Sequence, residues 1–239
     1  MTKEKKKNKK LIIIIISIAV AVAAGLIIFF VTRSNDETDS SYEGYNYEKS
    51  EKKESKPKEL TESEKMLVKL NDLIDEGLVY DTGDYIAGEI PKGEYAFIKL
   101  SGSSSYYEED DAAGNIIDNE NFDSFGYVKV HATGNLETRG VLVSINAFEK
   151  LGVKGAKEIY EILNDIQDYN QGGFYKVGTD IEPGKYILES MGSAYWAKLS
   201  GPVSSNDIID NDNFNGKARV TLKNGQYLEI SRATLTKEE

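Results

Sequence analysis

A seven-residue pattern that occurs twice constrains the fold of this chain more than any other feature. Residues 116–122 read IIDNENF, and residues 208–214, ninety-two positions later, read IIDNDNF. Shorter matches flank both copies in the same order, at separations that drift between 85 and 93 residues. A unit of about 90 residues is too long for a solenoid repeat and suits a small domain. The sequence therefore predicts two tandem domains, residues 61–150 and residues 151–239.

Each predicted domain opens with a helix and continues as short strands. Residues 61–64 read T-x-x-E, the form of a capping box, and apolar residues then recur every three or four positions. A stripe with the same period runs from Ala156 to Ile166. Alternating apolar and polar runs follow, separated by turn signals such as Asn224-Gly225. The predicted fold class is mainly β with one helix per repeat (α+β): two antiparallel β-roll or β-sandwich domains, each preceded by a helix.

The segments around the pattern resemble a known family. Both copies keep the order I-x-x-G-x-Y, an aromatic pair, I-I-x-N-x-N and, in the second copy, G-x-Y-L-x-I. This order is similar to a β-rich domain of secreted and membrane-anchored surface proteins of Gram-positive bacteria. The resemblance is good over residues 174–233 and looser over residues 80–148. It implies an extracellular β domain and carries over no catalytic residue.

The N-terminus predicts a membrane anchor. Residues 11–31 are 21 consecutive residues without a charge, enough for a helix to cross the hydrocarbon core of a bilayer. Residues 1–10 carry a net charge of +5, and only Arg33 lies just beyond the apolar run. The positive-inside rule then leaves the N-terminus in the cytoplasm and the rest outside the cell. A cleaved signal peptide is the alternative, because Ala21-Val22-Ala23 offers small residues at cleavage spacing.

A stalk is expected between the anchor and the domains. Residues 32–60 are rich in Ser, Glu, Lys and Asp and contain few aliphatic residues. Such a segment cannot bury enough apolar surface to offset the entropy of ordering, so we expect it to be disordered. The tether would hold the folded part away from the membrane.

Charge and composition exclude several classes of site. The whole chain carries −11, and the first ten residues contribute +5 and Arg33 +1, which leaves −17 for residues 34–239. This surface disfavours nucleic acid and anionic lipid headgroups as partners. There is no cysteine, hence no disulfide, thiolate metal site or cysteine nucleophile. The single histidine, His131, is predicted to be an ordinary polar residue of a strand.

Two aromatic pairs are candidate contact residues. Tyr106-Tyr107 and Tyr195-Trp196 occupy matching places in the two repeats. Adjacent strand residues point to opposite faces, so one ring of each pair should enter the core and the other should be available to a ligand. Ordinary packing of both rings is the alternative.

The polar residues of the repeated pattern have two interpretations. Asp and Asn side chains commonly form turns with their own backbone, which predicts a structural corner. Carboxylates at alternate positions are also hard oxygen ligands, which would suit calcium, although the spacing is not that of an EF-hand. The residues concerned are Asp118, Asn119, Glu120, Asn121, Asp210, Asn211, Asp212 and Asn213.

These observations favour a non-enzymatic module at the cell surface. We expect it to bind a cell-envelope polymer or a protein partner, with no cofactor apart from the calcium considered above. No phosphate-binding loop, nucleophile elbow or H-E-x-x-H motif is present. The alternative is an extracellular hydrolase that works with two carboxylates, the only abundant catalytic type in this chain.

Overall fold

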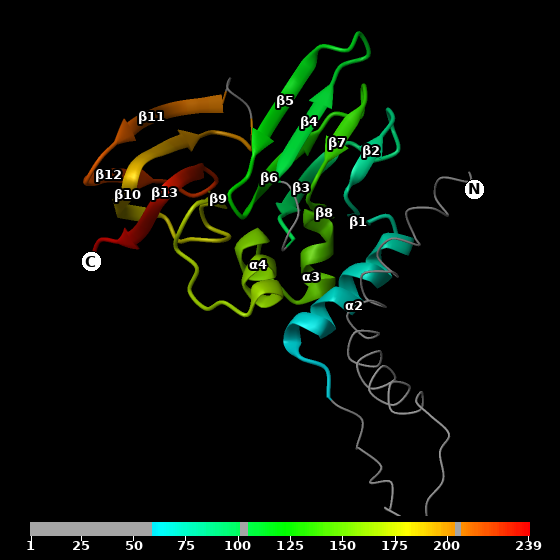
Figure 1. Cartoon of the computed structure of the whole chain (residues 1–239), viewed down its shortest axis with the longest axis horizontal. Helices are drawn as coiled ribbons and strands as arrows, with labels where there is room; N and C mark the ends of the chain where they lie inside the picture. Colours follow the sequence, from blue (N-terminus) through cyan, green and yellow to red (C-terminus); the bar gives the residue numbers. More distant parts are fainter. Residues whose placement is uncertain (1–58, 101–104, 204–206) are drawn as a thin grey trace, which may run out of the picture. The chain divides into compact units, whose positions relative to one another are not determined.

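The computed structural model describes residues 59–100, 105–203 and 207–239 (Figure 1). The predicted anchor, residues 11–31, and nearly all of the predicted stalk lie outside these residues. Within the described part of the chain, no helix is long and apolar enough to cross a membrane. Residues 62–239 form one compact unit.

The compact unit is mainly β, and its described residues contain three α-helices rather than one per repeat. These are α2 (Glu62–Asp75), α3 (Phe148–Leu151) and α4 (Ala156–Asn164), with a short 3-10 turn, η1 (Ile145–Ala147), before α3. Helix α2 begins directly after Thr61, as predicted, and buries Met66, Leu70 and Leu73 on one face. Figure 1 shows the three helices grouped together.

Helix α4 is shorter than its apolar stripe predicts. Asp165 adopts a left-handed conformation (φ 53°) and its N–H bonds back to the last turn, which ends the helix at Asn164. Ile166 therefore lies beyond the helix and is exposed. The short helix α3 was not predicted. Gly152, also left-handed (φ 75°), ends it one turn after it starts.

The described residues of the first half, 62–100 and 105–150, contain eight strands in two open sheets. All pairings are antiparallel, and the orders are β1-β8-β3-β6 and β2-β7-β4-β5. The strands are β1 (Val79–Tyr80), β2 (Gly83–Tyr85), β3 (Gly93–Ile98), β4 (Tyr106–Asp110), β5 (Ile116–Asn121), β6 (Phe125–Val130), β7 (Leu136–Thr138) and β8 (Val141–Ser144).

The second half, residues 151–239, builds one five-stranded open sheet from longer strands. Its order is β11-β10-β13-β9, with β12 paired to β10. The 16-residue β10 pairs with β12 along its first part and with β11 along its last part. In the first half, two separate strands make the equivalent pairings: β3 pairs with β6, and β4 pairs with β5. The strands are β9 (Gly173–Lys176), β10 (Gly184–Leu199), β11 (Ile208–Phe214), β12 (Lys217–Leu222) and β13 (Tyr227–Lys237).

Matching tyrosines brace the two halves in the same way. The hydroxyl of Tyr95 donates to the carbonyl of Pro91 (2.8 Å), and that of Tyr186 donates to the carbonyl of Glu182 (2.7 Å). Tyr85 and Tyr175 each bond likewise to the carbonyl four residues before them, both at 2.6 Å. Each ring stays in the core while its hydroxyl has an acceptor, which a buried tyrosine requires.

The two halves share one core. The ring of Phe125 meets that of Tyr175 edge-on, with centroids 5.0 Å apart, and Tyr127 meets Tyr227 at 5.7 Å. The buried Tyr127 hydroxyl accepts a hydrogen bond from the N–H of Ala156 (3.0 Å), the first residue of α4. The segments on either side of residue 150 are therefore packed together as one folded body.

Candidate functional site

The repeated pattern forms an edge strand in each half. Strand β5 pairs with β4 and β11 with β10, and each is the last strand of its sheet. The registers match: Tyr106 lies opposite Asn121, and Tyr195 lies opposite Asn213. The polar residues predicted as turn formers or calcium ligands thus lie within strands. The phenylalanines that close the pattern, Phe122 and Phe214, are both buried.

An identical irregularity interrupts both strand pairs. Asp118 and then Ile116 face consecutive residues of β4, so Ile117 has no partner across the ladder. The same happens at Ile209 on β11. One extra residue in one strand is a β-bulge, which bends the strand and increases its twist. The doubled isoleucine of the pattern therefore encodes a bent strand end in each half.

Each aromatic pair has one ring in the core, as predicted. Tyr107 is fully buried and Trp196 is 6 % exposed, so neither offers a surface contact. The indole Nε1 of Trp196 is one of two buried side-chain atoms of the described residues that lack a hydrogen-bond partner, the other being Oδ2 of Asp81. Tyr106 and Tyr195 are half-buried on the opposite faces of their strands. They are the rings left for a ligand.

Four hollows lie in series along the junction of the two halves, each sharing lining residues with the next, and together we call them the junction groove. Two hollows of about 240 Å³ each share Glu120, Phe174, Tyr195 and Glu229 in their walls. A third, of about 190 Å³, adjoins them at Asp118 and Val203. A fourth, of about 620 Å³, adjoins the third at Lys129 and Asp207.

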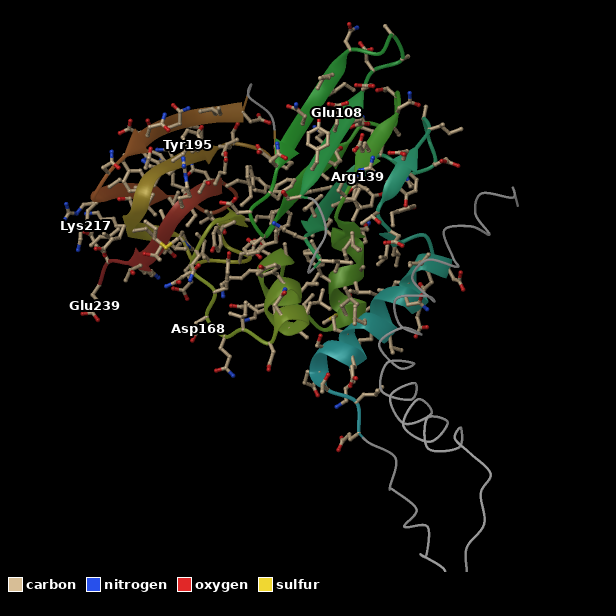
Figure 2. The ribbon with its side chains drawn as sticks, in the orientation of Figure 1. Glu108, Arg139, Asp168, Tyr195, Lys217 and Glu239 are labelled. Atoms are coloured by element: carbon tan, nitrogen blue, oxygen red, sulfur yellow. The ribbon has the colours of Figure 1, made fainter. Side chains whose placement is uncertain are left out.

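The junction groove brings together some of the predicted site residues. From the first copy of the pattern, Asp118, Asn119, Glu120 and Asn121 line it, and from the aromatic pairs only Tyr195 does so. Figure 2 marks Tyr195 in the second half, and marks Glu108 and Arg139 in the first. Tyr106 lies apart from these four hollows, and its hydroxyl bonds to the Glu108 carboxylate.

The second copy of the pattern faces solvent instead. All six residues from 208 to 213 are exposed. Asp210 forms a loose ion pair with Lys198 (3.5 Å), and the side-chain amide of Asn211 donates to the hydroxyl of Tyr195 (3.1 Å). Asp212 and Asn213 line none of the four hollows. Of this copy, only Ile208 borders the junction groove.

Carboxylates crowd one end of the junction groove. Burial raises the pKa of Glu229 to about 7, and the nearby charges of Glu120 and Asp123 add to the shift. The pKa of Glu120 is also raised, chiefly by burial, although the N–H of Asn121 opposes the shift. Glu229 is therefore close to half-protonated at neutral pH, so its carboxyl group can donate as well as accept a hydrogen bond.

Sequence reasoning missed Glu229 and Asp123. Glu229 interrupts the apolar run of β13, and a charged residue inside such a strand is a signal that could have marked it. Asp123 follows the repeated pattern directly, but only the packing of the second half against β5 brings it toward Glu229. No feature of the first half alone predicts that neighbour.

His131 has a structural partner. The buried carboxylate of Glu109 accepts hydrogen bonds from the backbone N–H of His131 (2.8 Å) and of Ala132 (2.8 Å). The imidazole Nδ1 lies 2.9 Å from the same carboxylate. Ala132 has a positive φ of 61°, a strained conformation for a residue other than glycine. Glu109 therefore holds the chain in this turn after β6.

A separate hollow of about 560 Å³ beside α4 is the weaker candidate. Its Asp180 carboxylate accepts hydrogen bonds from the backbone N–H groups of Lys157 (3.0 Å) and Lys176 (2.8 Å). Burial raises the pKa of Asp180 to about 6 in opposition to these bonds. Since each of its oxygens already has a backbone donor, Asp180 connects the start of α4 to β9.

Metal binding is not supported by any cluster in the described ranges. Among residues 59–100, 105–203 and 207–239, no three histidine, aspartate or glutamate side chains are grouped so that they could hold a metal ion. Calcium binding by the repeated pattern stays a prediction.

Comparison with known proteins points to the cell surface. The model of the family described as the Rv1352-like extracellular domain matches residues 167–228. No curated protein matches the chain. The matched segment contains strands β9 to β12, and with them Tyr195 and the second copy of the pattern. The second half of the chain is thus similar to an extracellular β-rich domain family, which indicates a cell-surface module located outside the cell.

Proposed function

We propose that this chain is a binding module of the cell surface, anchored in the membrane by residues 11–31, and that its junction groove binds a polymer of the cell envelope. The observation that carries the proposal is the position of Tyr195. Its ring lines the groove between Glu120 of the first half and Glu229 of the second. Neither half alone contains this arrangement.

The chemistry of this arrangement suits a sugar polymer. The half-buried ring of Tyr195 offers a flat apolar surface on which a sugar ring can stack. The carboxyl group of Glu229, which can both donate and accept hydrogen bonds near neutral pH, matches the hydroxyl groups of a glycan. A series of adjoining hollows suits an extended chain better than a single small molecule.

The test is co-sedimentation of residues 58–239 with insoluble cell-wall material from a Gram-positive bacterium. The compact unit has its own core, so we expect this fragment to fold alone. Tyr195→Ala should weaken retention more than about fivefold, because truncating a central interface aromatic costs more than about 1 kcal/mol. Tyr106→Ala, at the matching position of β4, is the control and should retain wild-type binding.

Two results would count against the proposal. Loss of binding in Tyr106→Ala as large as in Tyr195→Ala would move the site out of the groove. No retention of the wild type would favour a protein partner instead of an envelope polymer.

One observation favours a hydrolase as the second candidate. Glu229, with its pKa raised to about 7, faces a groove that also contains Glu120. A carboxyl group that is protonated near neutral pH can act as a general acid, and glycosidases use two carboxyl groups in this way. Release of soluble sugar fragments by the wild type but not by Glu229→Gln would support it. Glu137→Gln, at the matching position of β7, is the control. A binding module would release nothing and would leave the wall intact.

A further inference from the structure

We infer that the hollow at the far end of the junction groove binds a phosphate-type oxyanion carried by the ligand, an inference that rests on the proposed function. This hollow is the largest of the four, about 620 Å³, and we call it the lysine hollow. Three lysines line it: Lys92, Lys129 and Lys176. They come from the turn before β3, from β6 and from β9.

Lys176 is committed to the fold. Its ammonium group forms an ion pair with Glu94 (2.7 Å) and lies over the rings of Tyr127 (5.7 Å) and Tyr227 (5.5 Å). The Tyr227 hydroxyl donates to the same Glu94 oxygen (2.8 Å). The opposite charges of Glu94 and Lys176 cancel, so this ion pair forms a fixed wall of the hollow that has no net charge.

Lys92 and Lys129 differ from Lys176 in their partners. Both are exposed, and in the described part of the chain neither ammonium group makes a hydrogen bond or an ion pair. Lys129 lies directly opposite Glu94 in the β3–β6 ladder, a position where opposite charges commonly pair. Because Lys176 and Tyr227 already occupy Glu94, the charge of Lys129 stays uncompensated.

The acidic character of the whole body does not remove this local charge. Residues 34–239 carry −17, but at physiological ionic strength charges are screened over about 8 Å. Within the lysine hollow the remaining carboxylate is Asp207, which accepts a hydrogen bond from the Ser200 hydroxyl (3.1 Å). Two uncompensated ammonium groups against one carboxylate leave a net positive hollow.

The ligand chemistry follows from these groups. Lysine binds phosphate oxygens as a point charge and needs no fixed planar geometry. The hollow shares Lys129 and Asp207 with the neighbouring part of the junction groove. A polymer that stacks on Tyr195 could therefore place a phosphodiester near Lys92 and Lys129. The same phosphodiester chemistry is offered by lipid headgroups, so the source has to be decided by experiment.

The experiment compares two double variants of residues 58–239. Lys92→Ala/Lys129→Ala removes the uncompensated charges, and Lys154→Ala/Lys185→Ala removes two exposed lysines that do not line the hollow. The net charge changes equally. Each protein is tested on cell-wall material and on vesicles of phosphatidylglycerol or phosphatidylcholine, with and without added inorganic phosphate.

We expect Lys92→Ala/Lys129→Ala to bind about fivefold more weakly than the wild type, which is the effect of losing two exposed ion pairs. The control variant should lose less than about twofold. Inorganic phosphate should compete with the wild type. A selective loss on wall material assigns the oxyanion to a wall polymer, and one on phosphatidylglycerol vesicles assigns it to a lipid headgroup. Equal binding by both double variants, with no competition by phosphate, would overturn the inference even if the Tyr195→Ala effect holds. If the wild type binds neither surface, the NMR chemical shifts of the residues that line the lysine hollow are followed while inorganic phosphate is added. The absence of any shift change there would overturn the inference independently of the proposed function.

Discussion

Strands β5 and β11 share a sequence pattern, a register and a bulge, yet they meet different surroundings. On β5, Asp118 is buried and Glu120 is half-buried, and both line the junction groove. On β11, Asp210 and Asp212 are exposed. The second half packs over the first copy, while nothing in the described part of the chain covers the second. Local sequence therefore determines the strand, and the packing of the other half determines which carboxylates enter a site.

The same contrast holds for the neighbouring positions. Glu109 on β4 corresponds in register to Lys198 on β10, since they face Asp118 and Asp210. Glu109 is buried and accepts hydrogen bonds from the backbone N–H groups of His131 and Ala132, whereas Lys198 forms a loose ion pair with Asp210. Substitutions at matching positions of the two halves can therefore separate the contribution of the repeated pattern to stability from the contribution of its surroundings.

The largest difference is expected for the phenylalanines that end the pattern. Phe122 stacks on Phe97 (4.4 Å between centroids) and contacts Phe174 of the other half, whereas Phe214 has no ring partner among the described residues. Phe122→Ala should lower the free energy of unfolding by about 3–5 kcal/mol, and Phe214→Ala by about 2–3 kcal/mol. Urea denaturation measures both. Equal losses in the two variants would show that the packing of the second half against Phe122 adds no stability.

The next difference concerns the buried acid. Glu109→Ala leaves the N–H groups of His131 and Ala132 without their acceptor, so we expect a loss of about 2–4 kcal/mol. Lys198→Ala breaks an exposed ion pair and should cost less than about 1 kcal/mol. Both are measured by urea denaturation. A Glu109→Ala variant as stable as Lys198→Ala would contradict the structural role assigned to this carboxylate.

A smaller difference is expected in the pH dependence. The pKa of Glu229 is raised from 4.5 to about 7 in the folded protein, so between these values the folded state holds a proton that the unfolded chain has released. Its contribution to stability is complete below the lower value and is lost as the pH rises to the higher one. At pH 8, Glu229→Gln should be more stable than the wild type by about 1–2 kcal/mol, allowing for partial exposure.

Thermal unfolding between pH 4 and pH 8 tests this prediction. Glu137→Gln is the matched control, because Glu137 is paired with Arg139 on the exposed face of the first half. If the melting temperatures of both variants depend on pH as that of the wild type does, the crowding of carboxylates at the junction does not affect stability.

The smallest effect is expected for calcium. Among the described residues, no three acidic side chains are grouped so that they could hold a metal ion, and Asp210 already pairs with Lys198. The melting temperature in calcium and in chelator should agree within about 1 °C, well below the shift that 1 kcal/mol of binding would produce. A calcium-dependent rise that disappears in Asp210→Ala would restore the metal interpretation.

Patterns of short range were predictable from the sequence, and the junction was not. The apolar spacing after Thr61 predicts α2, and alternation predicts strands near Tyr95 and Tyr186. Asp and Asn favoured turns within the repeated pattern, but cross-strand pairing with β4 and β10 outweighs that local preference. Burial of Trp196 and the meeting of Glu120 with Glu229 depend on contacts between distant segments, which periodicity does not encode.

Hydrogen–deuterium exchange of residues 58–239, with and without solubilised cell-wall fragments, tests the central claim most directly. If the junction groove is the binding site, the fragments should slow exchange in residues 117–121 of β5 and leave residues 209–213 of β11 unchanged. Slower exchange on β11 alone, or on both strands equally, would mean that the ligand binds the repeated pattern itself, and the role given to the junction would be wrong.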